Sequence, residues 1–507
     1  MSEIDFCQAA AMRRRGYLGV DIGTSSSKGV LVEPGGRILR TAVREHTVDR
    51  PAPGHVEMDA EIWWREFTEL AGELTAPGDV DVVAVGVSGM GPCVLVTDGE
   101  GTPLRPAILY GIDTRAGAQI AALNAELGAE EIFARCGSTL SSQAVGPKLR
   151  WIAETEPDVH ARARRLFMPS SWLVYRLTGE YVLDYHSASQ CTPLFDTIDG
   201  VWYEPWARHV SPELELPPLR WPGEAAGVTT REVAGIPAGV PVITGTIDAW
   251  SEAVSVDAQN PGDLMVMYGT TMFLINTVRE RLTTPAMWAT MGAVPGTRNL
   301  AGGMATSGAI TAWLRDLTGG PDYPTMLAEA RDSGPGANGL LVLPYFAGER
   351  TPIFDPDARG VVAGLTLSHT RGDLYRAVLE ATAFGVRHNI EALREVGSEI
   401  SRVVAVGGGT RGELWTQIVT DVTGMAQVVP SVTIGASYGA AFLAAGLVDD
   451  VRMADWNPPA RVCEPNPEVR ATYDALYEQY RALYPASRDV QHALAAQQRI
   501  LSRGGKS

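Results

Sequence analysis

Two stretches of the chain share one pattern of hydrophobic and polar positions: an apolar run, a glycine, small hydroxyl residues and a second apolar run. The first covers residues 17–32 and the second covers residues 264–275. Each pattern predicts two antiparallel strands joined by a tight hairpin whose tip carries the hydroxyl groups. The second stretch follows the first by roughly 250 residues, which indicates two halves built alike by duplication. Only the first copy has a carboxylate before its glycine, because Tyr268 stands where the first copy has Asp21.

Apolar residues at helical spacing predict several amphipathic helices around these hairpins. One is predicted after Asp59, with a buried face formed by Ile62, Trp63, Phe67, Leu70 and Leu74. Longer helices are predicted over 373–396 and over 465–498. Short apolar runs at 82–87, 241–244 and 403–406 predict buried strands, each followed by a glycine-containing turn. Strands and helices therefore alternate as in an α/β protein.

Length and composition limit the organisation and the partners. A chain of 507 residues is too long for one hydrophobic core, so we expect two domains, 16–257 and 258–507, after a disordered extension over 1–15. The formal net charge of −17 argues against binding to nucleic acid, because phosphate backbones attract basic surfaces. No apolar run has membrane-spanning length. The five cysteines are scattered and form no CxxC pair, which is typical of a reduced, cytoplasmic protein without a zinc site.

The tip of the first hairpin has the composition of an anion site. Its backbone N–H groups, hydroxyls and one ammonium group would face the anion. Asp21 has the opposite charge, so a carboxylate here makes sense mainly with a cation between it and the anion. Phosphate with Mg²⁺ is therefore the first hypothesis, and an ordinary polar hairpin is the alternative. The residues concerned are Gly23, Thr24, Ser25, Ser26 and Lys28.

Two well-known phosphate motifs occur only in part. The GKS at 505–507 lacks the upstream glycine of a P-loop, since that position is Ile500. The glycines over 407–412 satisfy GxGxxG between a strand and a helix. A dinucleotide site also needs an acidic residue at the end of the next strand, and this strand ends in Pro430. We favour a third arrangement, in which two related lobes clamp a nucleotide between their hairpins.

The most specific pattern lies in the second half of the chain. Gly360-Val361-Val362-Ala363-Gly364-Leu365 is followed, after seven residues, by Asp373-Leu374-Tyr375-Arg376-Ala377-Val378-Leu379-Glu380. This order and spacing resemble the C-terminal signature of the FGGY family of carbohydrate kinases, and Lys148-Leu149-Arg150-Trp151 resembles the core of its N-terminal one. The resemblance extends from Gly19 to about Leu447. It implies the actin/hexokinase/Hsp70 (ribonuclease H-like) ATPase fold, with two related lobes around an interlobe cleft.

The resemblance also implies roles for particular residues. Asp248, after a buried strand and a glycine, stands where the family has its catalytic base, and it would share a Mg²⁺ ion with Asp21. The structural alternative is that Asp248 only caps the helix beginning at Ala249. Besides the first hairpin tip, the implied contacts to ATP are Gly269, Thr270, Thr271, Gly308, Gly407, Gly408 and Gly409. The implied contacts to the sugar are Ser88, Gly89, Met90, Gly91, Asp113 and Asp248.

These roles describe an ATP-dependent kinase that transfers the γ-phosphoryl group to a hydroxyl of a small sugar. The subfamily most resembled is that of the xylulokinases, which points to a ketopentose such as xylulose. Xylulokinases usually have Gln-Met-His-Gly after the strand, whereas this chain has Gly89-Met90-Gly91-Pro92. A different ketose, or a polyol like erythritol or glycerol, therefore stays open. A non-catalytic nucleotide-dependent sensor on the same fold is the alternative from another class. A homodimer is also left open.

Overall fold

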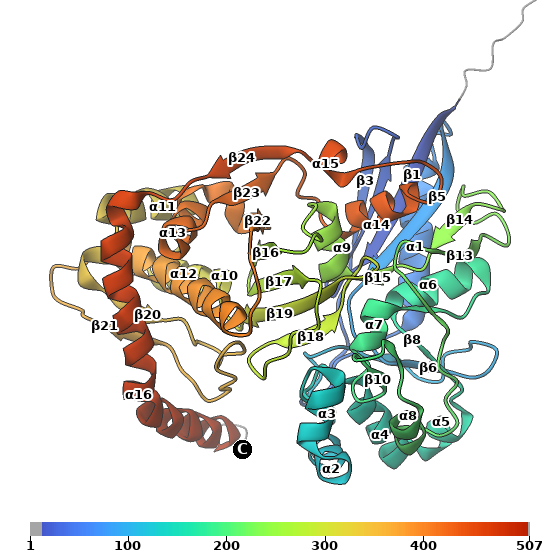
Figure 1. Cartoon of the computed structure of the whole chain (residues 1–507), viewed down its shortest axis with the longest axis horizontal. Coiled ribbons are helices and arrows are strands. Elements are labelled where there is room, and N and C mark those ends of the chain that lie inside the picture. Colours follow the sequence, from blue (N-terminus) through green and yellow to red (C-terminus); the bar gives the residue numbers. More distant parts are fainter. Residues whose placement is uncertain (1–12, 505–507) are drawn as a thin grey trace, which may run out of the picture.

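Each predicted hairpin forms the centre of its own mixed sheet in the computed structural model, which describes residues 13–504 (Figure 1). In the first sheet, β1 (Arg14–Ile22) pairs antiparallel with β2 (Ser26–Val32), which places Asp21 opposite Lys28. In the second, β16 (Asp263–Tyr268) pairs antiparallel with β17 (Met272–Val278), which places Tyr268 opposite Met272. Both hairpins are therefore confirmed, each in its own lobe.

The two sheets repeat one topology around these hairpins. β1 runs parallel to β5 (Val80–Gly89), as β16 runs parallel to β22 (Arg402–Val406). Across the sheet, the N-terminal lobe has the order β13-β14-β5-β1-β2-β3, with β15 also paired to β5, and the C-terminal lobe has β24-β23-β22-β16-β17-β19-β18. This is the predicted α/β architecture of two related lobes. The other strands are β3 (Ile38–Glu45), β13 (Ala225–Val228), β14 (Pro241–Ile243), β15 (Thr246–Ile247), β18 (Trp288–Met291), β19 (Arg298–Met304), β23 (Gln427–Pro430) and β24 (Pro459–Cys463).

Helices cover both faces of the N-terminal sheet. On one face lie α1 (Ala60–Thr75) and α6 (Pro169–Thr178). On the other lies α14 (Ala436–Ala445), which comes from the second half of the chain and also packs against α9 (Asp248–Ser255). A Cβ on Gly19 of β1 would lie only 2.0 Å from the Ser437 carbonyl oxygen. Glycine at this position lets α14 approach the sheet and join the two halves.

The part of the chain between β5 and β13 forms an additional layer of short elements (Figure 1, lower right). From Ala116 to Pro169 this layer is mainly helical, with one short strand, β8 (Arg165–Phe167), inside it. Its helices are α2 (Gly117–Leu127), α3 (Ala129–Cys136), α4 (Val145–Thr155), α5 (Pro157–Arg162), α7 (Tyr185–Ser189) and α8 (Glu204–Val210). The accompanying short strands are β6 (Leu95–Thr97), β7 (Ala107–Ile108), β9 (Leu183–Asp184), β10 (Phe195–Asp196), β11 (Val201–Trp202) and β12 (Leu219–Arg220). β4 (Glu57–Met58) comes earlier in the chain and pairs with β7.

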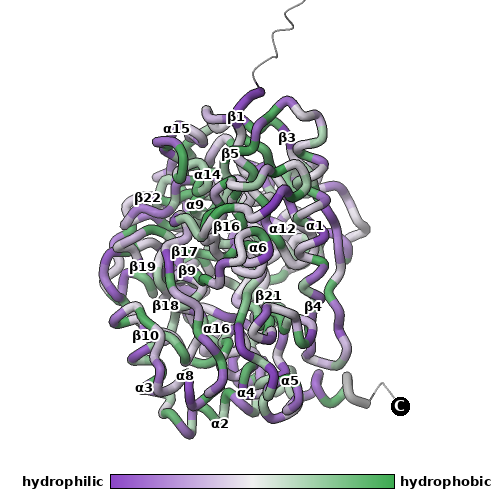
Figure 2. The backbone as a smooth tube through the Cα atoms, turned by 90° about the vertical axis from the view of Figure 1, so that its right-hand side faces the viewer, coloured by the Kyte–Doolittle hydropathy of each residue, from purple (hydrophilic) through white to green (hydrophobic). Residues whose placement is uncertain are grey.

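Long helices cover the C-terminal sheet. α12 (Arg371–Glu395) packs beside α13 (Leu414–Thr423). α16 (Arg470–Gly504) runs along the outer side of this lobe (Figure 1) and begins five residues later than the sequence predicts. Hydrophobic segments gather through the middle of the molecule, around α14 and β16, with hydrophilic segments along the outline (Figure 2). The remaining elements are α10 (Gly308–Leu317), α11 (Tyr323–Ser333), α15 (Met453–Trp456), β20 (Leu341–Leu343) and β21 (Val361–Ala363).

The remaining predictions concern the N-terminal extension, the domain boundary, membrane-spanning helices and the cysteines. Most of the extension predicted over 1–15 lies outside the described residues, but Arg14 and Arg15 already belong to β1. The domain boundary predicted at 257/258 falls between α9 and β16. Within residues 13–504, no helix is long and apolar enough to cross a membrane. Cys7 lies outside the described residues, and the free, buried cysteines are Cys93, Cys136, Cys191 and Cys463.

Candidate active site

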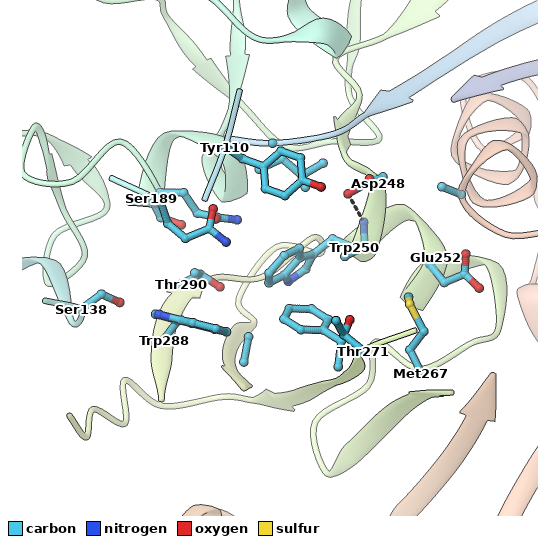
Figure 3. Close-up of a pocket in the computed structure, with 18 of the residues that line it drawn as sticks. Tyr110, Ser138, Ser189, Asp248, Trp250, Glu252, Met267, Thr271, Trp288 and Thr290 are labelled. Atoms are coloured by element: carbon cyan, nitrogen blue, oxygen red, sulfur yellow. Dashed lines mark hydrogen bonds between the residues drawn. The ribbon is translucent and has the colours of Figure 1, made fainter. Parts of the chain in front are cut away.

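A cavity of about 360 Å³ lies between the lobes and is lined by residues of both hairpins. Figure 3 shows Tyr110, Asp248 and Trp250 gathered at one side of it, with Thr271 and Trp288 below them. The cavity therefore brings acidic, basic and hydroxyl groups from distant parts of the chain into one space. The lining residues that the sequence predicted for the site are Asp21, Lys28, Gly91, Asp248 and Thr271.

Asp21 lies at the end of β1, where its buried carboxylate reaches the cavity. The parallel pairing of β1 with β5 places it beside Ser88, whose hydroxyl donates a hydrogen bond of 2.8 Å to Asp21 Oδ1. Burial raises the pKa of Asp21, against the lowering effects of this hydrogen bond and of Lys28. Ser88 does not line the cavity. The structure thus places Ser88 behind the carboxylate of Asp21, and the predicted sugar contact of Ser88 stays a prediction.

Asp248 begins α9 directly after β15. Its Oδ1 accepts a hydrogen bond of 2.7 Å from the Ala249 N–H (Figure 3), which ties the carboxylate to the start of the helix. The same carboxylate lines the cavity. Burial raises the pKa of Asp248, as does the charge of Asp21, against the effect of the Ala249 N–H. A carboxylate with a raised pKa in a cavity suits proton transfer, so the helix-end contact and the base role are compatible.

The acidic groups fit a Mg²⁺ ion. Asp21 and Asp248 offer carboxylate oxygens, the donors that Mg²⁺ prefers, and their buried charge is what a cation would offset. Within residues 13–504, no group of three or more His, Cys, Asp or Glu residues could hold a metal ion by itself. This agrees with the usual binding of Mg²⁺ through one or two carboxylates together with substrate phosphates. Asp21 and Asp248 are the residues that would hold it.

The tip of the first hairpin lies beside the cavity. The N–H of Gly23 donates to the Ser26 carbonyl at 3.1 Å, which closes the turn. Thr24 Oγ1 lies 2.9 Å from the hydroxyl oxygen of Tyr110, and Tyr110 lines the cavity. The turn, including Ser25, is therefore one hydrogen bond away from the cavity wall and can present its backbone to a phosphate.

The tip of the second hairpin contacts the start of α10. The N–H groups of Ser307 and Gly308 donate to the carbonyls of Thr270 and Gly269, each at 3.0 Å. A Cβ on Gly308 would lie 2.6 Å from the Gly269 carbonyl oxygen, so only glycine fits there without a shift. The structure thus brings together the Gly269, Thr270 and Gly308 positions that the sequence predicted for the nucleotide.

The turn after β22 reaches the same hairpin. A Cβ on Gly407 would lie 2.6 Å from the Tyr268 carbonyl oxygen, and its φ of +92° also favours glycine. A Cβ on Gly409 would meet the ring of Trp415 at 2.7 Å. Gly408 differs, because no atom lies within 4 Å of the place where its Cβ would be. The turn is tightly held at its ends and open at Gly408, which leaves room for a ligand at that point.

Comparison with known proteins identifies the family behind this arrangement. The model of the N-terminal domain of FGGY carbohydrate kinases matches residues 16–255, and that of the C-terminal domain matches residues 264–447. The chain belongs to the FGGY family of carbohydrate kinases. This confirms the predicted fold, and the protein is an ATP-dependent carbohydrate kinase.

The relatives of this FGGY kinase include enzymes named for two substrates. It is 34% identical to a glycerol kinase of Nocardia farcinica over 475 residues, which cover 87% of this chain and 93% of that one. It is 29% identical to a xylulose kinase of Escherichia coli over 483 residues, covering 92% and 98%. The crystal structure of xylulose kinase from Rhodospirillum rubrum has a TM-score of 0.88 and 33% identity, covering 94% of this chain and all of that one.

In this FGGY kinase the predicted sugar contact of Asp113 stays a prediction, and its carboxylate has other partners in the structure. The buried Asp113 carboxylate accepts a hydrogen bond of 2.6 Å from the Val56 N–H and pairs with Arg115 at 2.7 Å. Arg115 also pairs with Glu57. Asp113 does not line the cavity. The sequence offered an acidic residue near the site, but its partners make it part of a buried ion-pair network.

Of the glycine turn after β5, one predicted site residue reaches the cavity wall. Gly89 and Met90 are buried and do not line the cavity, whereas Gly91 does. A Cβ on Gly91 would lie 2.7 Å from the side chain of Ile247, which fills the space beside it. The turn therefore offers backbone to the cavity, and the polar side chains of the cavity come from other segments.

Much of the cavity wall comes from residues outside the predicted site. Arg350 lies in a loop rich in glycine, proline and charge, and Tyr110 lies just after β7, so both had a weak sequence signal. The others come from segments without a motif, in the additional layer and in the C-terminal sheet. They include Ser138, Gln143, Ser189, Gln190, Trp288 and Thr290, and α9 adds Trp250.

Glu252 is a third acidic group that the sequence interpretation missed. It lines the cavity one helical turn after Asp248 on α9. Burial raises the pKa of Glu252 to about 7, together with the charge of Asp21 and against that of Lys28. Glu252 follows Asp248 by four residues, which places both carboxylates on the same side of the helix. This spacing is the sequence signal from which Glu252 could have been predicted.

Proposed function

We propose that this kinase transfers the γ-phosphoryl group of ATP to a hydroxyl of a ketopentose such as xylulose. The observation that carries the proposal is the cavity in which Asp248 shares a wall with a set of neutral hydroxyl and amide side chains. This wall is suited to a polyhydroxylated acceptor that delivers one hydroxyl to the carboxylate. Its polar residues are Ser138, Thr139, Ser141, Gln143, Ser189, Gln190, Thr192 and Thr290.

Aromatic rings complete this acceptor pocket. Trp250, Phe273 and Trp288 line it, with Phe273 and Trp288 contributed by the C-terminal lobe. Rings give sugars an apolar face to pack on, while hydroxyl and amide groups read the positions of the sugar hydroxyls. A site built for hydroxyl contacts discriminates strongly against an acceptor that lacks one of them. Both lobes must therefore be in place for full recognition.

Phosphoryl transfer in this cavity assigns one task to each charged group. The acceptor hydroxyl gives its proton to Asp248 while its oxygen bonds to the γ-phosphorus, and the bond from that phosphorus to the β–γ bridging oxygen breaks to release ADP. Bound Mg²⁺, held by Asp21 and Asp248, would offset the charge of the phosphates. Lys28 lines the same cavity and adds a fixed positive charge.

A coupled ADP-release assay over D-xylulose, D-ribulose, glycerol, erythritol and xylitol tests the acceptor. We expect the highest kcat/KM with a ketopentose. A polyol as the best acceptor would establish the alternative, which the similarity to glycerol kinase favours. Chelation with EDTA should stop ADP release, and added Mg²⁺ should restore it.

Asp248→Asn tests the base and separates a kinase from a nucleotide sensor. We expect kcat to fall by about 10²–10⁴-fold while ATP binding is retained. Asp199→Asn is the matched control, because Asp199 is exposed in a loop. Unchanged turnover in Asp248→Asn would remove Asp248 from the base role. ATP binding without turnover of any acceptor by the wild-type protein would support the sensor.

We also propose where the kinase functions and how it assembles. Cytoplasmic function agrees with the free thiols of the four described cysteines, since oxidising compartments favour disulfides. A homodimer is the assembly to test, by light scattering coupled to size exclusion with and without ATP.

A further inference from the structure

The outer edge of the C-terminal sheet docks on the additional layer of the N-terminal lobe beside the acceptor pocket. β18 is the last strand of its sheet, and its free side hydrogen-bonds to residues around α7. The N–H of Met291 donates to Ser189 Oγ at 3.0 Å, and the N–H of Ala289 donates to Ser138 Oγ at 3.2 Å. The carbonyl of Met291 lies 2.8 Å from His186 Nδ1. This contact joins the lobes through the backbone of one strand.

His186 stands at the centre of this contact. Its side chain is fully buried, and its ring lies 3.7 Å from the ring of Trp250, centroid to centroid, at an interplanar angle of 30°. Trp250 is itself fixed, because its Nε1–H donates to Asn299 Oδ1 of β19 at 3.0 Å. The second ring nitrogen of His186, Nε2, lies 2.7 Å from Gln190 Nε2. The imidazole is therefore held in its plane with a partner at each nitrogen.

The partners determine which nitrogen carries the proton. The Met291 carbonyl can only accept, so His186 Nδ1 must carry hydrogen. Burial lowers the pKa of His186 to about 3, against the effect of the Met291 carbonyl, so the ring is neutral at physiological pH. A neutral ring with hydrogen on Nδ1 has a bare Nε2, which can only accept. The amide of Gln190 must then present its N–H₂ group to His186.

We propose that His186 is a positioning residue that turns the Gln190 amide so that Gln190 Oε1 faces the acceptor pocket as a hydrogen-bond acceptor. Gln190 lines the cavity, and among residues 13–504 no group donates a hydrogen bond to its Oε1. Gln190 Oε1 then selects a donor, which in a neutral sugar or polyol is a hydroxyl group. This inference rests on the proposed function and names a specificity determinant of the same site.

The relay ties recognition of the acceptor to the contact between the lobes. The atom that fixes the proton on His186 is a carbonyl of β18, in the C-terminal lobe, whereas His186 and Gln190 belong to the N-terminal lobe. Separation of the lobes would free the imidazole to carry its proton on either nitrogen, and the amide could then turn. Gln190 Oε1 is therefore held toward the acceptor pocket only while β18 contacts the N-terminal lobe.

A pair of isosteric variants tests the relay. In His186→Gln the side-chain oxygen can reach the place of Nε2 and accept from Gln190, whereas in His186→Asn the amide can replace only Nδ1. With D-xylulose as the acceptor we expect His186→Asn to raise KM about tenfold, with kcat and the KM for ATP changed less than about twofold. His186→Gln should stay within about threefold of the wild type. Equal losses in both variants would show that His186 acts only through packing.

A double-mutant cycle with Gln190→Ala shows whether His186 acts through Gln190. Gln190→Ala should raise the KM for D-xylulose about tenfold, and adding His186→Asn to it should have no further effect. Independent, multiplying effects would overturn the proposal. If D-xylulose proves a poor acceptor for the wild type, the same cycle is measured with the best acceptor from the ADP-release screen.

The tautomer can be read on the wild-type protein without turnover. ¹⁵N-histidine labelling should show one neutral imidazole with hydrogen on Nδ1 between pH 6 and 8, assigned by its loss in His186→Gln. Hydrogen on Nε2, or a ring that becomes charged in this range, would overturn the proposal. This measurement stays informative if the kinase acts on a different acceptor, so failure of the proposed function and failure of the relay are distinguishable.

Discussion

The hydroxyl of Ser88 donates a hydrogen bond of 2.8 Å to Oδ1 of Asp21, across the parallel pair of β5 and β1. Both side chains are buried, so this donor helps to keep Asp21 ionised in a place where burial raises its pKa. Ser88→Ala should therefore lower kcat about tenfold, the low end of the about 1.5–3 kcal/mol that a hydrogen bond to a charged group is worth, because Lys28 remains. Steady-state kinetics at saturating ATP and acceptor measures the change.

Ser27→Ala is the control for this prediction. Ser27 is also a buried serine, on the neighbouring strand β2, but its hydroxyl has no hydrogen-bond partner among the described residues. Removal of an unpartnered buried hydroxyl should leave kcat unchanged and keep or raise the thermal midpoint. A loss of kcat in Ser27→Ala as large as that in Ser88→Ala would attribute both effects to packing of the sheet.

Gly407 and Gly408 are adjacent, but substitution by alanine should destabilise the protein only at Gly407. Gly407→Ala would place a Cβ 2.6 Å from the Tyr268 carbonyl oxygen at a φ of +92°, so we expect a loss of about 1–3 kcal/mol of stability and a raised KM for ATP. Gly408→Ala enters open space and should leave the thermal midpoint unchanged. If adenosine packs there, the KM for ATP should still rise. An unchanged KM in Gly408→Ala would exclude Gly408 from the nucleotide site.

The sequence could predict the features that a short stretch of backbone determines by itself. The hairpins were predictable because an apolar run, a glycine and hydroxyls determine strand and turn within about 16 residues, and Asp21 sits at a defined place in that pattern. The place of Asp248 at the start of a helix followed in the same way from a strand and a glycine, whereas its role as a base was implied by the family resemblance and stays a prediction. The duplication made each prediction stronger, because two independent segments had to form the same structure.

The acceptor pocket was not predictable because its residues meet only in the folded chain. Gln190 and Trp288 are almost a hundred residues apart and become neighbours through the docking of β18 on the other lobe. Nothing in the local sequence around either residue indicates a ligand. Asp113 shows the same limit from the other side: its residue type suits a sugar hydroxyl, but sequence could not reveal its ion pair with Arg115 at 2.7 Å.

Asp113→Asn should change stability and leave acceptor affinity almost unchanged. The substitution leaves the buried Arg115 with only Glu57 as an acidic partner, and removal of one member of a buried ion pair costs about 3–5 kcal/mol. We expect a lower thermal midpoint and a KM for the acceptor within about twofold of the wild type. A raised KM at an unchanged midpoint would restore Asp113 to the sugar site.

The hydrogen bonds to Asp373 should make the stability of the fold depend on pH. Burial acts to raise its pKa, but hydrogen bonds from Ser333, Thr370 and Asn338 hold the pKa of Asp373 well below its usual range. A carboxyl whose pKa is lowered on folding stabilises the fold above its unfolded pKa of about 3.9 and loses this contribution as the pH falls toward the folded value. Asp373→Asn should therefore be less stable at pH 7 by about 1–3 kcal/mol.

The pH dependence of that difference is the informative measurement. The gap in unfolding midpoint between wild type and Asp373→Asn should be largest at neutral pH and narrow below about pH 4, where the wild-type carboxyl begins to lose its advantage. Asp199→Asn, at an exposed site, should show no gap at any pH. A gap that is constant from pH 7 to pH 3 would mean that charge contributes nothing and that only the shape of the α12 capping contact matters.

Arg350 brings a positive charge to the cavity from the C-terminal lobe, and its removal should slow the reaction. Its Nη2 donates to the Met304 carbonyl at 2.8 Å, while its buried Nε has no partner among the described residues. A fixed donor facing developing negative charge is worth about 10²–10³ in kcat, so Arg350→Ala should lose about 10²-fold and Arg350→Lys less. Arg359→Ala is the matched control, because Arg359 lies in the same loop but donates to the Ala358 carbonyl and to Gln498 at 2.8 Å, away from the cavity. An equal loss in both alanine variants would assign the effect to the loop and not to the charge of Arg350.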